Sequence, residues 1–370
     1  MNRLLIQVVN RHQLLFAICL KKSVFFDQIA DIVLVGDKFE YIDKSILKTY
    51  FAEIFELERY NIFRNYAEVV LSFVNPRFGF SRLIDINIED YSDYFFWNPG
   101  WLLYFIYKYS VKKRLDIRWH LIADGCGPIE LKYPTSVPLN MYSAFVGGKI
   151  FDFIDRKKYR FGCFDNWNLD SYIWGKNLIQ FDKGDMNIYD CPPVNMKDTE
   201  LLYDLKNLFK VSEINIKEKY IFLDTCWTDT KDGATVYPME EVIKLLDNIV
   251  DIVGEDNFIV KAHPRIDKSV YNKARHNIKV MEEDIPWEMV CLVADISDKV
   301  VISVFTSSFI MQYLMFGNLN VTYCVDHLLR WNNNWYNQMI RCRNIMDLLA
   351  VSYGKFIQIN DYNELENVLV

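Results

Sequence analysis

Four segments place chemically capable side chains directly after apolar runs. They are 123–127 (ADGCG), 223–230 (LDTCWTDT), 261–265 (KAHPR) and 305–308 (FTSS). In open α/β sheets, ligands bind beyond the carboxyl ends of the strands, where loops present free backbone groups and helix N-termini. Three of the four segments lie in the second half of the chain. That half is therefore expected to bind a phosphate-containing ligand.

The segment 261–265 is the strongest candidate for contact with a phosphate. Lys261, His263 and Arg265 follow the apolar run FIV, and Pro264 fixes the backbone where the strand ends. Since an imidazole titrates near neutrality, His263 can stabilise a departing phosphate or give it a proton. The alternative is a strand-end histidine that only bonds a loop carbonyl.

The segment 305–308 combines hydroxyls with the start of a predicted helix. Thr306, Ser307 and Ser308 stand where unpaired backbone N–H groups converge, which suits an anion. The alternative is that they serve as an ordinary helix N-cap. Its candidacy as a phosphate contact is strengthened because it follows the next predicted strand after the segment 261–265.

Carboxylates follow two further strands and are candidates for a general base. Asp124 precedes Gly125 at a tight turn, where it can take a proton from a hydroxyl, although Asp-Gly is also a common plain turn. Asp224, followed by Thr225, and Asp229 are rival bases.

Two further features of the sequence bear on how a ligand would be bound. Glu288 follows Pro286 at a predicted helix start, where it can bind two ribose hydroxyls or merely interact with the helix dipole. No D-x-D motif and no His/Cys set with metal-ligand spacing occurs in the sequence, so we expect no bound metal.

Two series of alternating strands and helices must position these residues. The first runs from LLIQVV through DIVLVG and a helix at 44–57 to IRWHLIADG, and the second from KYIFLD to LNVTYCV. A less periodic middle, 128–215, separates them. With 370 residues, the chain exceeds one ordinary core. We therefore predict an α/β fold of two Rossmann-like, doubly wound domains, 1–215 and 216–370, facing each other across a cleft.

The composition limits the binding partners and the cellular compartment that we expect for this protein. The 42 basic and 49 acidic residues give a net charge of −7, so no overall field attracts nucleic acid, and we expect none as a partner. The eight cysteines are scattered singly, as in reduced cytosolic proteins. Neither a signal peptide nor a membrane anchor is apparent, which favours a cytoplasmic location.

The aromatic and basic stretch 97–118 has two interpretations. It is either a buried helix with a solvated basic end, which we favour, or a surface resting on anionic lipid at the inner face of the membrane.

The ordered set of an Asp-Gly turn, His-Pro, Pro-x-Glu and a Ser-Ser pair resembles bacterial sialyltransferases, both the lipooligosaccharide sialyltransferases and their polysialyltransferase relatives. The likeness covers about 219–325, and in the first half only the opening strand and 124–125. It implies a GT-B fold and an inverting, metal-independent transfer of sialic acid from CMP-sialic acid to a galactoside of a capsule or lipooligosaccharide. The partners would be this nucleotide sugar and a glycan acceptor.

The resemblance also implies roles for individual residues. His263 would assist the departing CMP phosphate, Ser307 and Ser308 would bind it, and Glu288 would hold the ribose. The candidates for catalysis are Asp124, His263 and Asp224, and those for donor binding are Gly125, Thr225, Lys261, Pro264, Arg265, Glu288, Thr306, Ser307 and Ser308.

Departures from the family pattern leave alternatives open. The family's acidic pair before glycine is here Ala123-Asp124, and its Thr-Pro-x-Gln pattern is Asn10-Arg11-His12-Gln13. The base can therefore be Asp124 or Asp224. A transferase of the same fold that uses a UDP or GDP sugar, and a non-catalytic protein that binds nucleotide or glycan, are the alternative functions.

Overall fold

The computed structural model describes most of the chain in two compact units. The described residues are 3–36, 39–57, 68, 71, 74–97, 101–122, 169–178, 187–211, 214–225, 239–264, 266–282, 285–330 and 336–370. Unit 1 comprises Met1–Asn177, Phe181–Val194 and Thr199–Val211, and unit 2 comprises Leu178–Gln180, Asn195–Asp198 and Ser212–Val370.

Unit 1 is built on a parallel sheet of seven strands in the order β3-β2-β1-β4-β5-β6-β7. The strands are β1 (Arg3–Val8), β2 (Ile29–Val35), β3 (Ile54–Leu57), β4 (Asp93–Phe96), β5 (Arg118–Ile122), β6 (Leu169–Ile173) and β7 (Ile188–Asp190). Strands β1 and β2 are almost continuously buried, as expected for inner parallel strands covered on both faces. The strand order reverses between β1 and β4, which makes their carboxyl ends the switch point of this sheet.

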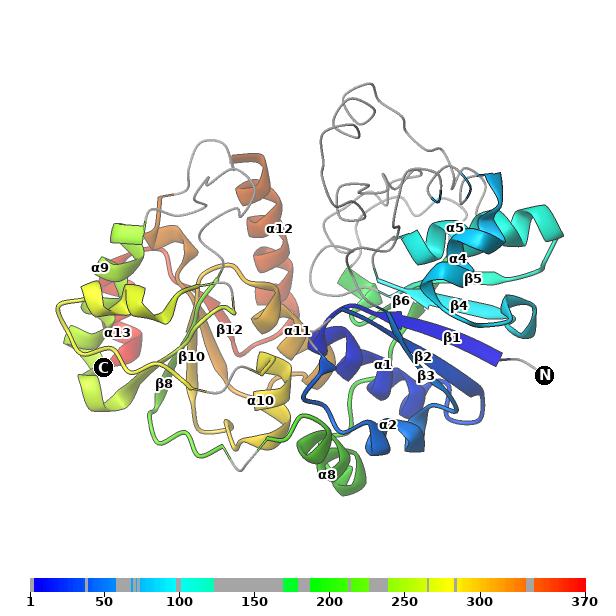
Figure 1. The fold of residues 1–370 in the computed structure, drawn as a ribbon. Helices are drawn as coiled ribbons and strands as arrows, with labels where there is room; N and C mark the ends of the chain where they lie inside the picture. Colours follow the sequence, from blue (N-terminus) through cyan, green and yellow to red (C-terminus); the bar gives the residue numbers. More distant parts are fainter. Residues whose placement is uncertain are drawn as a thin grey trace. The chain divides into compact units, whose positions relative to one another are not determined.

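Helices cover both faces of this sheet, with α1 and α2 on one side and α4 and α5 on the other (Figure 1). Their bounds are α1 (Arg11–Ser23), α2 (Lys44–Tyr50), α4 (Pro76–Leu83), α5 (Trp101–Lys113) and α8 (Thr199–Leu208), with 3₁₀ turns η2 (Ile88–Asp90) and η4 (Lys176–Leu178). Helices α4 and α5 approach closely because Gly79 faces the ring of Phe105, where an added Cβ would lie only 2.7 Å from the ring.

Unit 2 has a parallel sheet of five strands in the order β12-β11-β10-β8-β9. The strands are β8 (Tyr220–Leu223), β9 (Phe258–Lys261), β10 (Val300–Ser303), β11 (Val321–Cys324) and β12 (Phe356–Gln358). The chain runs from β8 to β9 on one side and then crosses to β10 on the other. The switch point therefore lies between β8 and β10.

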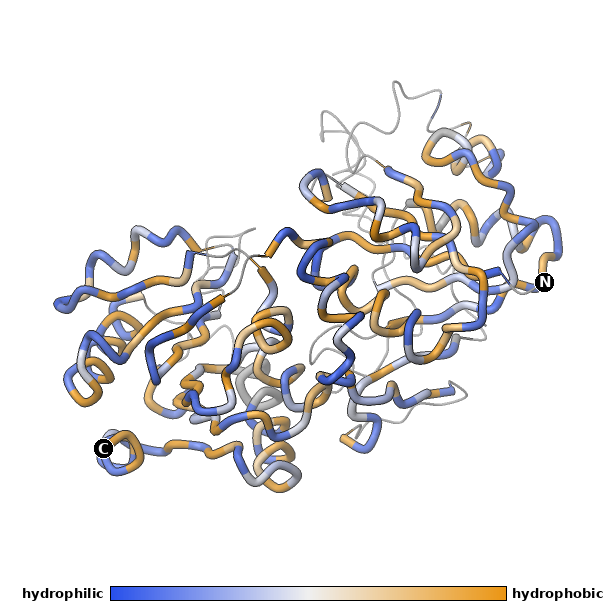
Figure 2. The backbone as a smooth tube through the Cα atoms, turned by 90° about the horizontal axis from the view of Figure 1, so that it is seen from below, coloured by the Kyte–Doolittle hydropathy of each residue, from blue (hydrophilic) through white to orange (hydrophobic). Residues whose placement is uncertain are grey.

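Helices also flank the second sheet, and Figure 1 shows α9 and α13 on one face and α10 and α11 on the other. Their bounds are α9 (Met239–Val253), α10 (Trp287–Val293), α11 (Ser307–Phe316), α12 (Tyr336–Ser352) and α13 (Tyr362–Leu369), with 3₁₀ turns η5 (Glu255–Asn257), η6 (Lys268–Lys273) and η7 (Asp326–Leu328). Hydrophobic and hydrophilic residues follow one another at short intervals along the chain (Figure 2). In α9 the buried residues recur with helical spacing and pack onto β8 and β9 in one core.

The two doubly wound parallel sheets confirm the predicted α/β class. One local expectation was wrong, and some elements of unit 1 were not predicted. The predicted helix at 44–57 ends at Tyr50, and Ile54–Leu57 forms edge strand β3. The less periodic middle contributes β6, β7 and α8 to unit 1. Strand β4 has only four residues, and its polar first residue, Asp93, concealed it.

Candidate functional site

The ends of β8, β9 and β10 meet at one edge of the second sheet. Leu223 is in register with Lys261 on one side and with Ser303 on the other. We call the residues that follow these three ends the carboxyl edge: 224–225, 262–264 and 304–308. Since neighbouring strands are about 4.8 Å apart, the segments after β9 and β10 lie about two strand spacings apart.

The end of β9 and the segment after it carry a lysine and a histidine. Lys261, the last strand residue, is buried, His263 is half-buried and Pro264 is exposed. The carbonyl oxygen of His263 accepts a hydrogen bond from the amide of Ile266 at 2.9 Å, which turns the backbone directly after the histidine. Arg265 lies outside the described residues. His263 is thus half-accessible at the carboxyl edge, and its role toward a phosphate stays a prediction.

The segment after β10 opens α11. Thr306 has the extended backbone of an N-cap, and its hydroxyl accepts from the amide of Ser308 at 3.4 Å. Ser307 and Ser308 are half-buried in the first turn. Thr306 therefore has the capping role of the alternative interpretation, while both serines stand at the positions that a helix N-terminus offers to an anion.

Asp224 follows β8 and is almost fully buried. One carboxylate oxygen, Oδ1, accepts from the amide of Thr225 at 2.7 Å, and Oδ2 accepts from the hydroxyl of Tyr271 on η6. Burial and the negative charge of Asp224 raise the pKa of Tyr271, which keeps this hydroxyl protonated as a donor. The sequence analysis missed Tyr271, because a lone tyrosine in a 3₁₀ turn carries no pattern.

Glu288 lies on α10 and has no exposed surface. Burial, with the nearby charge of Glu288, raises the pKa of the Cys291 thiol one turn later. Binding of a ribose by Glu288 stays a prediction, and it would require the ligand to reach a buried carboxylate.

A buried polar network joins α10 to α11. Trp287 donates from its indole Nε1 to Gln312 Oε1 at 2.8 Å, and Gln312 donates from Nε2 to Asn320 Oδ1. All three side chains are buried. The network fixes the helix that carries Glu288 against the helix that begins with Ser307. In the sequence, Gln312 only interrupts the apolar run 300–316, and no role in a network was predicted for it.

The candidate base of unit 1 follows β5. Asp124 and Gly125 lie outside the described residues, as does Asp229. On β5 itself, His120 is buried, and its Nε2 lies 2.7 Å from Oδ1 of buried Asp93 on neighbouring β4. Burial alone would raise the pKa of Asp93, but hydrogen bonds from His120, Arg118 and Ser92 lower it to about 2. This ion-paired carboxylate lies at the start of β4, at the opposite end of that strand from its carboxyl end.

Gln13 occupies the one matching position of the family's opening pattern, and its role here is local. The side chain of Asn10 accepts from the Gln13 amide at 2.8 Å, and the Gln13 side chain accepts from the Val9 amide at 2.9 Å. This reciprocal pair caps α1 at the switch point of the first sheet.

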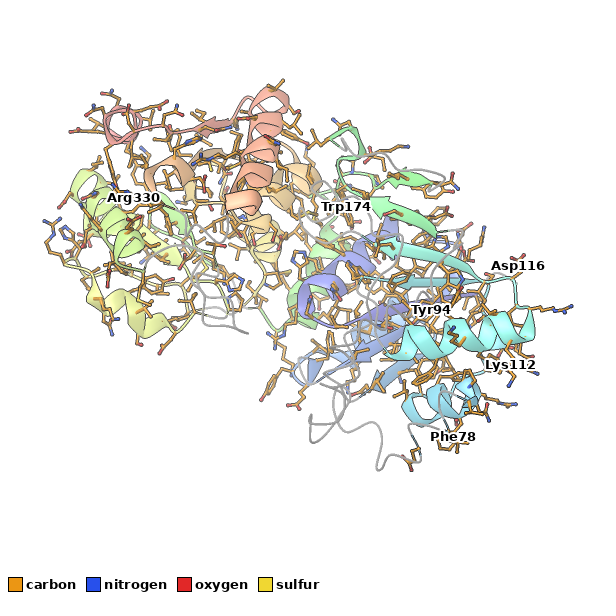
Figure 3. All side chains as sticks on the ribbon, turned by 90° about the horizontal axis from the view of Figure 1, so that it is seen from above. Phe78, Tyr94, Lys112, Asp116, Trp174 and Arg330 are labelled. Carbon is orange, nitrogen blue, oxygen red and sulfur yellow. The ribbon has the colours of Figure 1, made fainter. Side chains whose placement is uncertain are left out.

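The stretch 97–118 contains α5, whose aromatic side chains Phe105 and Tyr109 are buried in the core of unit 1. Lys112 and Lys113 are exposed at its end, and Figure 3 shows Lys112 on the helix and Asp116 in the turn after it. Contact of this basic end with a membrane stays a prediction. Within the described part of the chain, no helix is both long and apolar enough to cross a bilayer.

The described residues also contain no group of three or more potential metal ligands.

A family model gives the most specific comparison. The model for the alpha-2,8-polysialyltransferase family (POLYST) matches residues 233–325, about a quarter of the chain. The match confirms the resemblance over a range that holds His263, Glu288, Ser307 and Ser308, the elements β9 to β11 and the N-terminus of α11. Asp224 and β8 lie before it. A search of curated proteins found no match.

Solved structures of low sequence identity resemble the chain over most of its length. A putative UDP-N-acetylglucosamine 2-epimerase from Listeria monocytogenes is 10% identical, with a TM-score of 0.48, over 87% of this chain and 79% of that one. The UDP-GlcNAc 2-epimerase from Neisseria meningitidis, bound to UDP-GlcNAc, is 10% identical, with a TM-score of 0.46, over 99% and 94%. MurG from Acinetobacter baumannii is 8% identical, with a TM-score of 0.42, over 100% and 89%.

Proposed function

We propose that this protein is a glycosyltransferase that moves sialic acid from CMP-sialic acid onto a galactoside-type acceptor, with inversion at the anomeric carbon. The acceptor would be a bacterial capsule or lipooligosaccharide, reached from the cytoplasmic face of the membrane. One observation carries the proposal. The polysialyltransferase model matches the same segment that forms the β9 and β10 parts of the carboxyl edge.

The chemistry divides into attack and departure. The acceptor oxygen attacks the anomeric carbon while the bond from that carbon to the phosphate oxygen breaks, and CMP leaves. Asp124 or Asp224 would take the proton of the acceptor hydroxyl. His263 would stabilise the phosphate or protonate it, because a half-exposed imidazole can exchange its proton with solvent.

Donor binding would use the start of α11 and the cation that ends β9. Amides and hydroxyls at Ser307 and Ser308 would bind the CMP phosphate, with Lys261 contributing positive charge. Glu288 would hold the ribose hydroxyls. This arrangement supplies the charge stabilisation of the leaving group from the chain itself, and we propose that no metal takes part.

Turnover of CMP-sialic acid tests the proposal. Purified protein is incubated with CMP-sialic acid and galactose-terminated acceptors, and CMP and the sialylated product are measured. Thermal unfolding with CMP, UDP and GDP tests the nucleotide, since a ligand that binds the native state raises the melting temperature according to its affinity. If only UDP or GDP raises the melting temperature, the donor is a UDP or GDP sugar and not CMP-sialic acid. CMP binding without turnover would indicate a non-catalytic binding protein.

A further inference from the structure

Asp224 contacts both ends of the loop that carries His263. Its amide donates to the carbonyl oxygen of Lys261 at 3.1 Å, where the loop leaves β9. Its carboxylate accepts from the hydroxyl of Tyr271, where the loop has entered η6. The loop 262–270 therefore lies between two residues, Lys261 and Tyr271, that both contact the residue directly after β8.

The interior of this loop is held by short-range bonds. The amide of Ile266 donates to His263, and Asp267 caps η6 by accepting from the amide of Ser269 at 2.9 Å. These local bonds shape the turns but do not attach the loop to the sheet. The loop also contacts the rest of unit 2 through Lys268, whose Nζ donates to the carbonyl oxygens of Met281 and Glu282, and through Ile266 and Val270, which pack against the core. The two contacts with Asp224 lie on either side of His263 and join its segment to the end of β8.

The surroundings of Asp224 disfavour a role as general base. A base must come within hydrogen-bonding reach of the proton that it removes. The Asp224 residue is only 4% exposed, and each carboxylate oxygen already accepts a hydrogen bond from within unit 2. Tyr271, its partner, is 2% exposed, so neither group is presented to an acceptor.

We propose that Asp224 is the anchor of the loop 262–270 rather than the base, and that Tyr271 is the positioning residue that completes the anchor. Through this contact the pair holds His263 at the carboxyl edge. The consequence for catalysis rests on the proposed function. The anchoring itself does not, because it follows from the hydrogen bonds.

The variant Tyr271→Phe removes only the hydroxyl, and Tyr220→Phe is its matched control. Tyr220 is buried in the same core, and its hydroxyl donates to the carbonyl oxygen of Leu369 at 2.8 Å. Both variants thus lose one buried hydrogen bond in unit 2, but only one of them touches the loop. Amide hydrogen exchange should become faster across 262–270 in Tyr271→Phe and stay unchanged there in Tyr220→Phe. Equal exchange of the loop in both variants would overturn the anchor.

Nucleotide binding and pH dependence give the functional readout. We expect Tyr271→Phe to weaken CMP binding about tenfold, the effect of one lost hydrogen bond to a charged group, and Tyr220→Phe to leave it within a factor of about two. The acidic limb of the kcat profile should stay in place in both variants. Movement of that limb in Tyr271→Phe alone would make Asp224 the titrating base and overturn the proposal.

Asp224→Asn provides a second test if Tyr271→Phe does not fold. The amide oxygen can still accept from Tyr271, so the anchor predicts a fall in kcat of about tenfold or less, while loss of a general base predicts about 10²- to 10⁴-fold. Wild-type protein that neither binds CMP nor turns over CMP-sialic acid would refute the proposed function. The exchange experiment would still decide on the anchor, because it needs no substrate.

Discussion

Trp287 and Gln312 share a buried hydrogen bond of 2.8 Å that links α10 to α11. The same glutamine donates onward to Asn320, so one side chain connects both helices to the start of β11. Because the first turns of α10 and α11 carry Glu288 and Ser307, this bond sets the spacing of two candidate donor contacts.

Replacing Gln312 with leucine should destabilise unit 2. The indole N–H of Trp287 would be left buried without its acceptor, and such a group costs about 1–3 kcal/mol. Urea unfolding measures the loss. Gln358→Leu is the control, since Gln358 bonds Asp347 at the surface, and we expect it to change stability little. Equal urea midpoints for Gln312→Leu and wild type would show that the network does not contribute to the stability of unit 2.

Gly79→Ala should destabilise unit 1 even though alanine is the better helix former. The helix propensity gain is about 1 kcal/mol, but the new Cβ would lie 2.7 Å from the ring of fully buried Phe105. Overpacking of this kind costs about 1–3 kcal/mol, so we expect a net loss. Thermal unfolding checks it, with Gly354→Ala as a control at which nothing lies within 4 Å. Adding Phe105→Leu to Gly79→Ala should recover part of the loss, and no recovery would argue against the clash.

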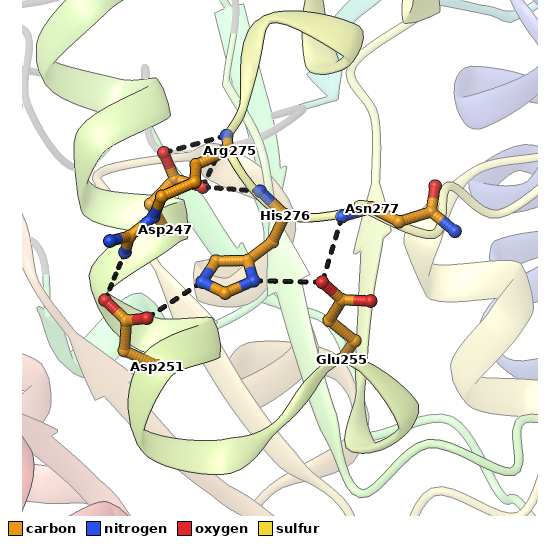
Figure 4. A network of polar contacts seen from close by, with 6 residues as sticks. All are labelled: Asp247, Asp251, Glu255, Arg275, His276 and Asn277. Atoms are coloured by element: carbon orange, nitrogen blue, oxygen red, sulfur yellow. Dashed lines mark hydrogen bonds and ion pairs between the residues drawn. The ribbon is translucent and has the colours of Figure 1, made fainter.

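An exposed cluster around His276 should make stability depend on pH (Figure 4). The imidazole lies 2.8 Å from Asp251 and 2.9 Å from Glu255, and the hydrogen bonds with these carboxylates raise the pKa of His276 above 6.5. The same contacts lower the pKa of Asp251 and of Glu255 below 3.8 and 4.5.

These pKa shifts determine how the stability changes with pH. The stabilisation from His276 is fully present below pH 6.5 and is lost as the pH rises through its raised folded-state pKa. That from the carboxylates is present above their ordinary pKa values and is lost in acid. The melting temperature of wild type should therefore exceed that of His276→Gln more at pH 5.5 than at pH 8.5, and salt should reduce the difference. A difference that grows toward pH 8.5 would contradict the ion pairs.

His263→Ala should lower kcat while the fold persists. Loss of a general acid reduces turnover by about 10²- to 10⁴-fold, and His263 is a half-exposed loop side chain whose removal leaves no core cavity. Steady-state kinetics with CMP-sialic acid measure the effect. His327→Ala is the matched control, because His327 is exposed on η7 in the same unit. Similar activity of the two variants would remove His263 from the mechanism.

The family model matches a range that includes two candidates selected from the sequence, His263 and Ser307. Both follow apolar runs, and the rule that ligands bind at carboxyl ends of parallel strands selected them as candidates, whose roles stay predictions. The helix at 239–253 was also predictable, because its buried residues recur with helical spacing over four turns. The short edge strand β3 was not, since four residues carry too little periodicity to compete with the preceding helix.

The sequence by itself determined the alternation of strands and helices, the α/β class and the segments at which polar side chains leave the sheets, because these follow from local periodicity along the chain. Only the tertiary structure decided that Tyr271 reaches Asp224 and that Gln312 joins two helices. These contacts span 47 and 25 residues of sequence. Such pairings depend on strand order and helix packing, which bring together side chains that no local pattern relates.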